Sequence, residues 1–217
     1  MAFSLGQVAR YVRILEIARK RYEEIAQISQ TRFLEKMNWA KQPGTRKLTS
    51  DEIRDLDNDW KRELLLHREI ETYFMFSNIL LGKIAYCIED FFGLVEPTGL
   101  HSHNQLCKNI KKYSQSLSLV LPEGFWERAV NLKDIVTDFR NNQVTHFLDP
   151  RAIYGTMYHP KDGVQMSVSR LNPKSGETQV DSPNIKETNR TVGDYIDLFI
   201  EFIQINRDKS RYNAPTG

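Results

Sequence analysis

An arginine, two asparagines, a glutamine and a histidine lie within seven positions of the segment DFRNNQVTHF (138–147). Arg140 carries a permanent charge and can bind a phosphate through two parallel hydrogen bonds. His146 titrates near neutral pH and can transfer protons. RNA cleavage needs both abilities, because the 2′-hydroxyl must lose a proton while negative charge builds up on the phosphorus. Asn141 can hold a phosphate oxygen or orient the histidine.

The polar residues continue the apolar face of the helix that the sequence predicts before them. At about 100° per residue, one stripe within about 60° contains Leu132, Ile135, Val136 and Phe139. Gln143 and His146 extend this stripe, and Asn142 lies at its edge. An unpaired buried polar group costs about 1–3 kcal/mol. We therefore expect these groups to satisfy one another or to line a cleft, where Asn142 and Gln143 would contact RNA.

Helix geometry also separates the two charged candidates. Six residues of regular helix place Arg140 and His146 roughly 120° apart, so a single helix does not direct both groups at one phosphate. A second copy of the segment, related by a two-fold axis, would supply the missing group. This geometry predicts a homodimer with a composite site.

The segment from Arg140 to His146 resembles the Arg-x(4–6)-His motif of the HEPN superfamily (higher eukaryotes and prokaryotes nucleotide-binding domains). A polar residue follows the arginine in that family, as Asn141 does in this chain. The resemblance implies a four- or five-helix bundle and a metal-independent endoribonuclease without a cofactor. It assigns the catalytic roles to Arg140, His146 and Asn141, with RNA as the substrate.

The resemblance further implies a dimer that acts as a toxin or in antiviral defence, often beside an antitoxin protein. Some family members carry a tyrosine two places after the histidine, which the antitoxin modifies. Leu148 stands there in this chain, so we do not expect that mode of control.

Two other interpretations of the segment remain open. The chain could be a catalytically silent helical module that binds RNA or a protein in a toxin–antitoxin or regulatory complex. Alternatively, Arg140 pairs with Asp134, Asp138 or another carboxylate, and His146 is a hydrogen-bonded core residue, since buried polar groups are usually satisfied.

Three lysines form a second candidate site. Lys108, Lys111 and Lys112 lie in a predicted short helix without acidic residues and beside a tyrosine. Such a patch could guide RNA, and the alternative is a solvated helix face.

A histidine and cysteine cluster precedes and overlaps this basic helix. His101, His103 and Cys107 could supply three zinc ligands. No fourth ligand follows at a familiar spacing, and a closed zinc site needs four. We therefore expect no metal site.

The arrangement of apolar residues predicts an all-α fold, an antiparallel bundle of four to five main helices. A long helix over about 7–41 ends at a Pro-Gly turn. A second helix starts from the capping box of Thr49 and Glu52 and runs to Phe92, where Gly93 stops it. The acidic first part of this helix, residues 51–63, is predicted to project beyond the core.

The period changes after residue 150. Residues 151–181 alternate in polarity around a turn and predict a small β-hairpin or meander insertion. A final helix is predicted to start with Thr191 as its N-cap. We expect one HEPN-like domain over residues 1–211 and a flexible tail over 212–217.

The bulk composition of the 217-residue chain is that of an ordinary globular protein, with 27% charged residues and a net charge of +2. Residues 1–50 are basic and residues 51–100 are acidic. The basic segment could attract a polyanion or pair with the acidic one. Two cysteines form no disulfide framework, and no apolar stretch suits a membrane span. We expect a cytoplasmic protein that does not insert into membranes.

Overall fold

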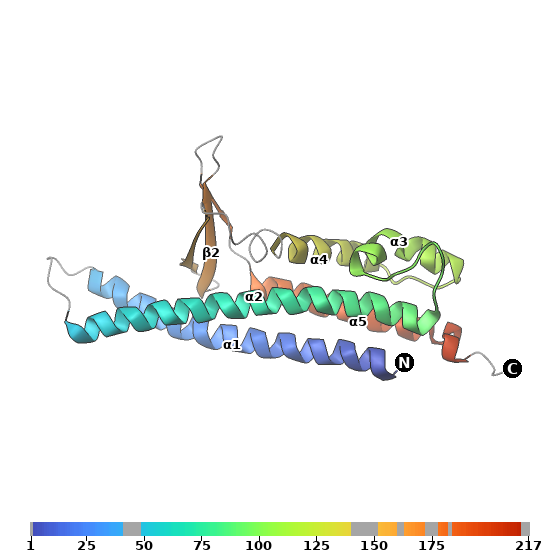
Figure 1. Ribbon diagram of the computed structural model, residues 1–217, viewed down its shortest axis with the longest axis horizontal. Helices are drawn as coiled ribbons and strands as arrows, with labels where there is room; N and C mark the ends of the chain where they lie inside the picture. The colour runs from blue at the N-terminus through green and yellow to red at the C-terminus, as the bar shows by residue number, and fades with distance from the viewer. Residues whose placement is uncertain are drawn as a thin grey trace. The chain divides into compact units, whose positions relative to one another are not determined.

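The computed structural model describes residues 2–40, 49–139, 152–159, 163–171, 178–181 and 184–213. Helices account for most of these residues (Figure 1). The helices are α1 (Ala2–Ala40), α2 (Ser50–Phe92), α3 (His103–Ser116), α4 (Phe125–Phe139) and α5 (Ile185–Ile205), followed by the 3-10 turns η2 (Arg207–Lys209) and η3 (Arg211–Asn213). The predicted all-α helical character of the fold is confirmed.

The chain forms two compact units. The first unit contains the start of α1, the second part of α2, and the segment from α3 to α4 together with α5 and the C-terminal turns. The second unit contains the rest of α1, the first part of α2 and the strands. Helices α1 and α2 pass from one unit to the other after residues 16 and 73.

Helix α2 begins and ends as its sequence predicts. The Thr49 N–H donates to Glu52 Oε2 at 2.7 Å, and the Glu52 N–H donates to Thr49 Oγ1 at 3.3 Å. These two bonds are the reciprocal pair of a capping box. At the other end Gly93 adopts a φ of +102°, which favours glycine, and its N–H bonds to Glu89 O at 2.8 Å.

Helix α5 begins earlier than predicted. It starts at Ile185, so Thr191 lies inside the helix and is not its N-cap. The Thr191 hydroxyl donates to Glu187 O at 3.0 Å, four residues back. A threonine can make this bond in a helix interior as well as cap a helix, and the sequence alone does not separate the two cases.

The core of the first unit is rich in aromatic rings. Phe125 lies 5.3 Å from Tyr195 and 5.4 Å from Phe202, measured between ring centroids. Phe92 lies 5.4 Å from the same Phe202. These contacts join α2, α4 and α5. In the second unit the buried side chains of the described helices include Ala18, Tyr22, Leu66, Ile70 and Tyr73.

Three strands follow α4 and precede α5 along the sequence, in the region where the sequence predicts a hairpin. They are β1 (Ala152–His159), β2 (Gly163–Leu171) and β3 (Thr178–Asp181), in the sheet order β1-β2-β3. Both pairings are antiparallel, with Ala152 opposite Arg170 and Leu171 opposite Thr178.

The 3-10 turn η3 includes Tyr212 and Asn213, the first two residues of the segment predicted as a tail. The Tyr212 hydroxyl donates to Asp90 Oδ1 at 3.1 Å, which fixes this part of the chain. Residues 214–217 lie outside the described residues. Among the helices that the structure describes, none is long and apolar enough to cross a membrane.

Candidate functional site

Helix α4 carries the apolar stripe that the sequence predicts. Leu132 and Val136 are fully buried, Phe139 is almost fully buried, and Ile135 is half-buried. The predicted site residues follow directly after this helix. Arg140, Asn141, Asn142, Gln143 and His146 lie outside the described residues, so the arrangement of the Arg-His segment stays a prediction.

The end of α4 is held by an aromatic stack. The rings of Phe139 and Phe74 lie 3.9 Å apart between centroids, with an angle of 15° between their planes. Phe74 belongs to α2, so this stack fixes the last described residue of α4 on the core of the first unit. The chain therefore enters the Arg-His segment from an anchored position.

Asp134 is one of the carboxylates that the alternative interpretation pairs with Arg140. The structure places its Oδ1 atom 3.6 Å from Lys133 Nζ, within the distance of an ion pair. Because its side chain is mostly exposed, this pair is weak.

Helix α3 presents the predicted lysines on its exposed side. Ser102 caps the helix by accepting a hydrogen bond from the Gln105 N–H at 3.3 Å. One face of the helix is buried and consists of His103, Leu106, Cys107, Ile110, Tyr113 and Ser114. Lys108, Lys111 and Lys112 are all exposed. The predicted basic patch is therefore a surface that solvent and ligands can reach.

Lys111 also contacts the start of α4. Its Nζ atom lies 3.9 Å from the centroid of the Trp126 ring, a cation–π contact. The Trp126 indole N–H donates to Cys107 O at 2.7 Å, which fixes the ring. Phe139 lies thirteen positions after Trp126, or about 20 Å further along the helix. Lys111 thus contacts α4 at the end opposite to Phe139, after which the Arg-His segment follows in the sequence.

The three candidate zinc ligands do not converge in the structure. His103 Nε2 lies 3.2 Å from the Tyr195 hydroxyl, and its Nδ1 lies 3.8 Å from Cys107 Sγ. His101 instead points its Nδ1 toward Glu89 Oε2 at 3.1 Å. In the part of the chain that the structure describes, no three His, Cys, Asp or Glu side chains group as metal ligands.

Burial keeps the His103 cluster uncharged. It lowers the pKa of His103 to about 4, helped by the nearby Lys133, and raises the pKa of Cys107 to about 11. Burial also raises the pKa of Tyr195 well above its usual value. A thiol that stays protonated is a poor nucleophile and a poor metal ligand. These residues form a neutral network that joins α3 to α5.

Glu89 organises the loop between α2 and α3. Its Oε1 atom accepts a hydrogen bond from the Leu100 N–H at 2.9 Å, and its Oε2 atom contacts His101. The Asn109 side chain supports the same loop by donating to Gly99 O at 3.0 Å. The sequence gives no sign of these contacts, because their partners are joined by a loop of irregular backbone.

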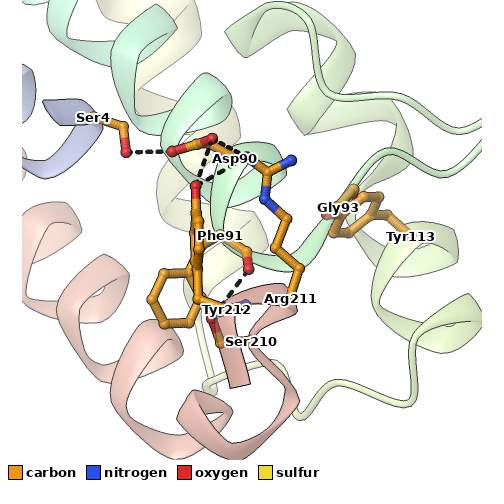
Figure 2. Close-up of polar contacts among 8 residues, drawn as sticks. All are labelled: Ser4, Asp90, Phe91, Gly93, Tyr113, Ser210, Arg211 and Tyr212. Carbon is orange, nitrogen blue, oxygen red and sulfur yellow. Dashed lines mark hydrogen bonds and ion pairs between the residues drawn. The ribbon is translucent and has the colours of Figure 1, made fainter. Parts of the chain in front are cut away.

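Asp90 collects hydrogen bonds from segments far apart in the sequence (Figure 2). The Ser4 hydroxyl donates to its Oδ2 atom at 2.7 Å, and Tyr212 and Arg211 donate to Oδ1. These contacts hold the pKa of Asp90 below its usual value, with the Ser4 hydrogen bond as the largest cause. Beside them the Tyr113 hydroxyl donates to Gly93 O at 2.6 Å.

Comparisons with known proteins found no relative of this chain. No family model matches the sequence, and neither a curated protein nor a solved structure is significantly similar to the chain.

Proposed function

We propose that this protein is a metal-independent endoribonuclease of the HEPN type. The observation that carries the proposal is the segment Arg140-Asn141-Asn142-Gln143-Val144-Thr145-His146, placed directly after an amphipathic helix. The buried stripe of α4 and the stack of Phe139 on Phe74 support it. A helix end held in this way gives the following residues a fixed starting point, as a catalytic group needs.

In the proposed reaction the RNA supplies its own nucleophile. His146 removes the proton from a 2′-hydroxyl, the oxygen attacks the adjacent phosphorus, and the bond to the 5′-oxygen breaks. The products are a 2′,3′-cyclic phosphate and a free 5′-hydroxyl, with the proton returned to the leaving oxygen by a second acid. Arg140 binds the phosphate and offsets the charge of the transition state. Asn141 orients the phosphate or the histidine.

The second acid comes from a partner copy in this proposal. Two Arg-His segments face each other across a two-fold axis, so that both copies of His146 act on one phosphate. The protein acts in the cytoplasm as a toxin or an antiviral defence factor, which an antitoxin protein could restrain. The exposed lysines of α3 bind a more distant part of the RNA, and residues 151–181 form an insertion in the helical domain.

The test is cleavage of a generic RNA by the purified protein in the presence of EDTA. Wild-type protein should cut the RNA and leave a cyclic phosphate, which mass spectrometry of the products identifies. The His146→Ala and Arg140→Ala variants should each lose at least about 10²-fold in rate, the usual contribution of a positioned acid–base group.

Two matched variants control for the removal of a charge or a ring. Arg128→Ala removes an arginine of α4 whose guanidinium pairs with Asp194 at 3.4 Å, and His101→Ala removes a half-exposed histidine. Both should cut RNA at the wild-type rate. A need for Mg²⁺, or full activity of His146→Ala, would refute the assignment. Tight RNA binding without cleavage would favour the silent binding module.

A further inference from the structure

The first part of α2 is a helix without a buried side. From residue 51 to residue 65 no side chain is buried, although the helix runs without a break into its packed part. The first buried residue of α2 is Leu66. A helix of this length is marginal in water on its own, and most helices are stabilised by packing an apolar face. Such a face is present here, but it is exposed.

The exposed apolar face consists of four side chains at helical spacing. They are Ile53, Leu56, Trp60 and Leu64, with exposed fractions of 56%, 43%, 60% and 51%. The successive spacings of three, four and four residues keep them within about 80° around the helix axis. We call these four residues the α2 stripe. Contiguous apolar patches of this kind mark interaction sites on soluble proteins.

The surface around the α2 stripe is acidic. Residues 51–65 contain six carboxylates and three basic side chains. At about 100° per residue, Glu52, Asp57 and Glu63 lie beside the stripe, whereas Asp51 and Asp55 lie on the opposite side of the helix. Arg54, Lys61 and Arg62 pair with Asp51, Asp57 and Asp59 of the same helix, which leaves the segment with a net charge of −3. An apolar face bordered by negative charge repels phosphates and anionic lipid surfaces and attracts a positively charged partner.

We propose that the α2 stripe docks a basic amphipathic helix of a partner protein. Such a helix places its apolar side chains on the α2 stripe, while its Lys or Arg residues face Glu52, Asp57 and Glu63 beside it. Trp60, the most exposed of the four, is the residue type most often dominant at interfaces. A second copy of α2 fits less well, because it brings a similarly acidic segment to the contact. This inference does not depend on the ribonuclease proposal.

A designed peptide tests the inference with full-length protein. The probe is a fluorescein-labelled peptide of about 20 leucine and lysine residues, long enough to form an amphipathic helix. Its partner probe replaces every lysine by glutamate. Fluorescence anisotropy should show binding of the lysine peptide only, and added salt should weaken it. The Trp60→Ala/Leu64→Ala double variant should bind at least about tenfold more weakly.

Matched variants separate this site from general stickiness. Ile200→Ala removes another exposed apolar side chain, 44% exposed on α5, and should bind the peptide like wild type. Asp57→Asn/Glu63→Gln, at two carboxylates beside the stripe, should weaken binding with the stripe intact. Circular dichroism checks that the helices persist, which is expected because the exchanged side chains are exposed. Equal binding by the Trp60→Ala/Leu64→Ala variant, equal binding of the glutamate peptide, or a wild-type dimer that Trp60→Asp dissociates would overturn the proposal.

Discussion

The Ser4 hydroxyl donates a 2.7 Å hydrogen bond to Asp90 Oδ2, a carboxylate 86 residues further along the chain. The other oxygen of Asp90 accepts bonds from Arg211 and from the Tyr212 hydroxyl. One side chain at the end of α2 thus secures the first turn of α1 and the last turn of the described chain.

Asp90→Asn should lower the free energy of unfolding by about 1 kcal/mol at neutral pH, because its partners are partly solvated. The pKa of Asp90 is lowered in the folded state. Its stabilisation is therefore complete above the unfolded pKa of about 3.9 and is lost as the pH falls through the folded pKa. Urea unfolding should show the difference from wild type shrink below that range. Asp194→Asn, which removes a weak surface pair with Arg128, should change little at either pH.

His103 should make the protein sensitive to moderate acid. Its pKa falls from 6.5 to about 4 on folding, so the unfolded chain binds a proton first as the pH drops. The folded state then loses up to roughly 3 kcal/mol between the two pKa values. Thermal unfolding of wild type should show this loss, and His103→Gln should show a smaller slope between those values. His101→Gln should keep the steep wild-type slope; a flat wild-type profile would refute the burial of His103.

Asn206 joins the end of α5 to the segment before α4. Its fully buried amide accepts a bond from the Val120 N–H at 2.7 Å and donates to Val120 O and Phe202 O. Asn206→Asp keeps the shape but loses both donors, so it should cost about 3 kcal/mol of unfolding free energy. Chemical denaturation measures this. Asn213→Asp, at an exposed amide that donates to Arg207 O, is the control and should cost far less.

Phe139→Ala should remove the stack on Phe74 and leave a cavity at the end of α4. We expect a loss of about 3–5 kcal/mol in unfolding free energy. Phe3→Ala removes a phenylalanine that is 77% exposed and should be nearly neutral in the same urea titration. Equal stability of the two variants would mean that α4 is not anchored by this stack.

The lysines of α3 should affect RNA binding without affecting the chemical step. Lys108→Glu/Lys112→Glu should weaken RNA binding by about tenfold or more and reduce its salt dependence. The rate at saturating RNA should stay unchanged, because α3 meets the far end of α4, about 20 Å from Phe139 along the helix. Filter binding and single-turnover kinetics separate the two effects. A fall in the saturated rate would place these lysines at the cleavage site.

The sequence predicts a contact correctly where its two partners are close neighbours along the chain. The capping bonds of Thr49 and Glu52 and the glycine stop at Gly93 involve residues within four positions of one another. The buried stripe of α4 follows from helical periodicity alone. Thr191 shows the limit of such reasoning, since its hydroxyl can cap a helix or bond within one.

The contacts that sequence reasoning missed depend on the tertiary fold. Asp90, Asn206 and the pair of His103 with Tyr195 bind partners 86 to 122 positions away. A polar residue in an apolar stretch signals that a partner is needed, but it does not identify that partner. For the same reason the sequence does not show that His101 pairs with Glu89, while His103 and Cys107 contact one another and His103 contacts Tyr195.

Because Ser4 and Arg211 both contact Asp90, the two ends of the described chain lie close together in the first unit. A short linker could join these two ends at little entropic cost, because they already lie close together. We therefore expect the first unit to fold when its helices follow one another in a different order along the chain. A circular permutant opened in an exposed loop should keep the same core. A tag or fusion partner attached at either end of the described chain, in contrast, would lie near Asp90.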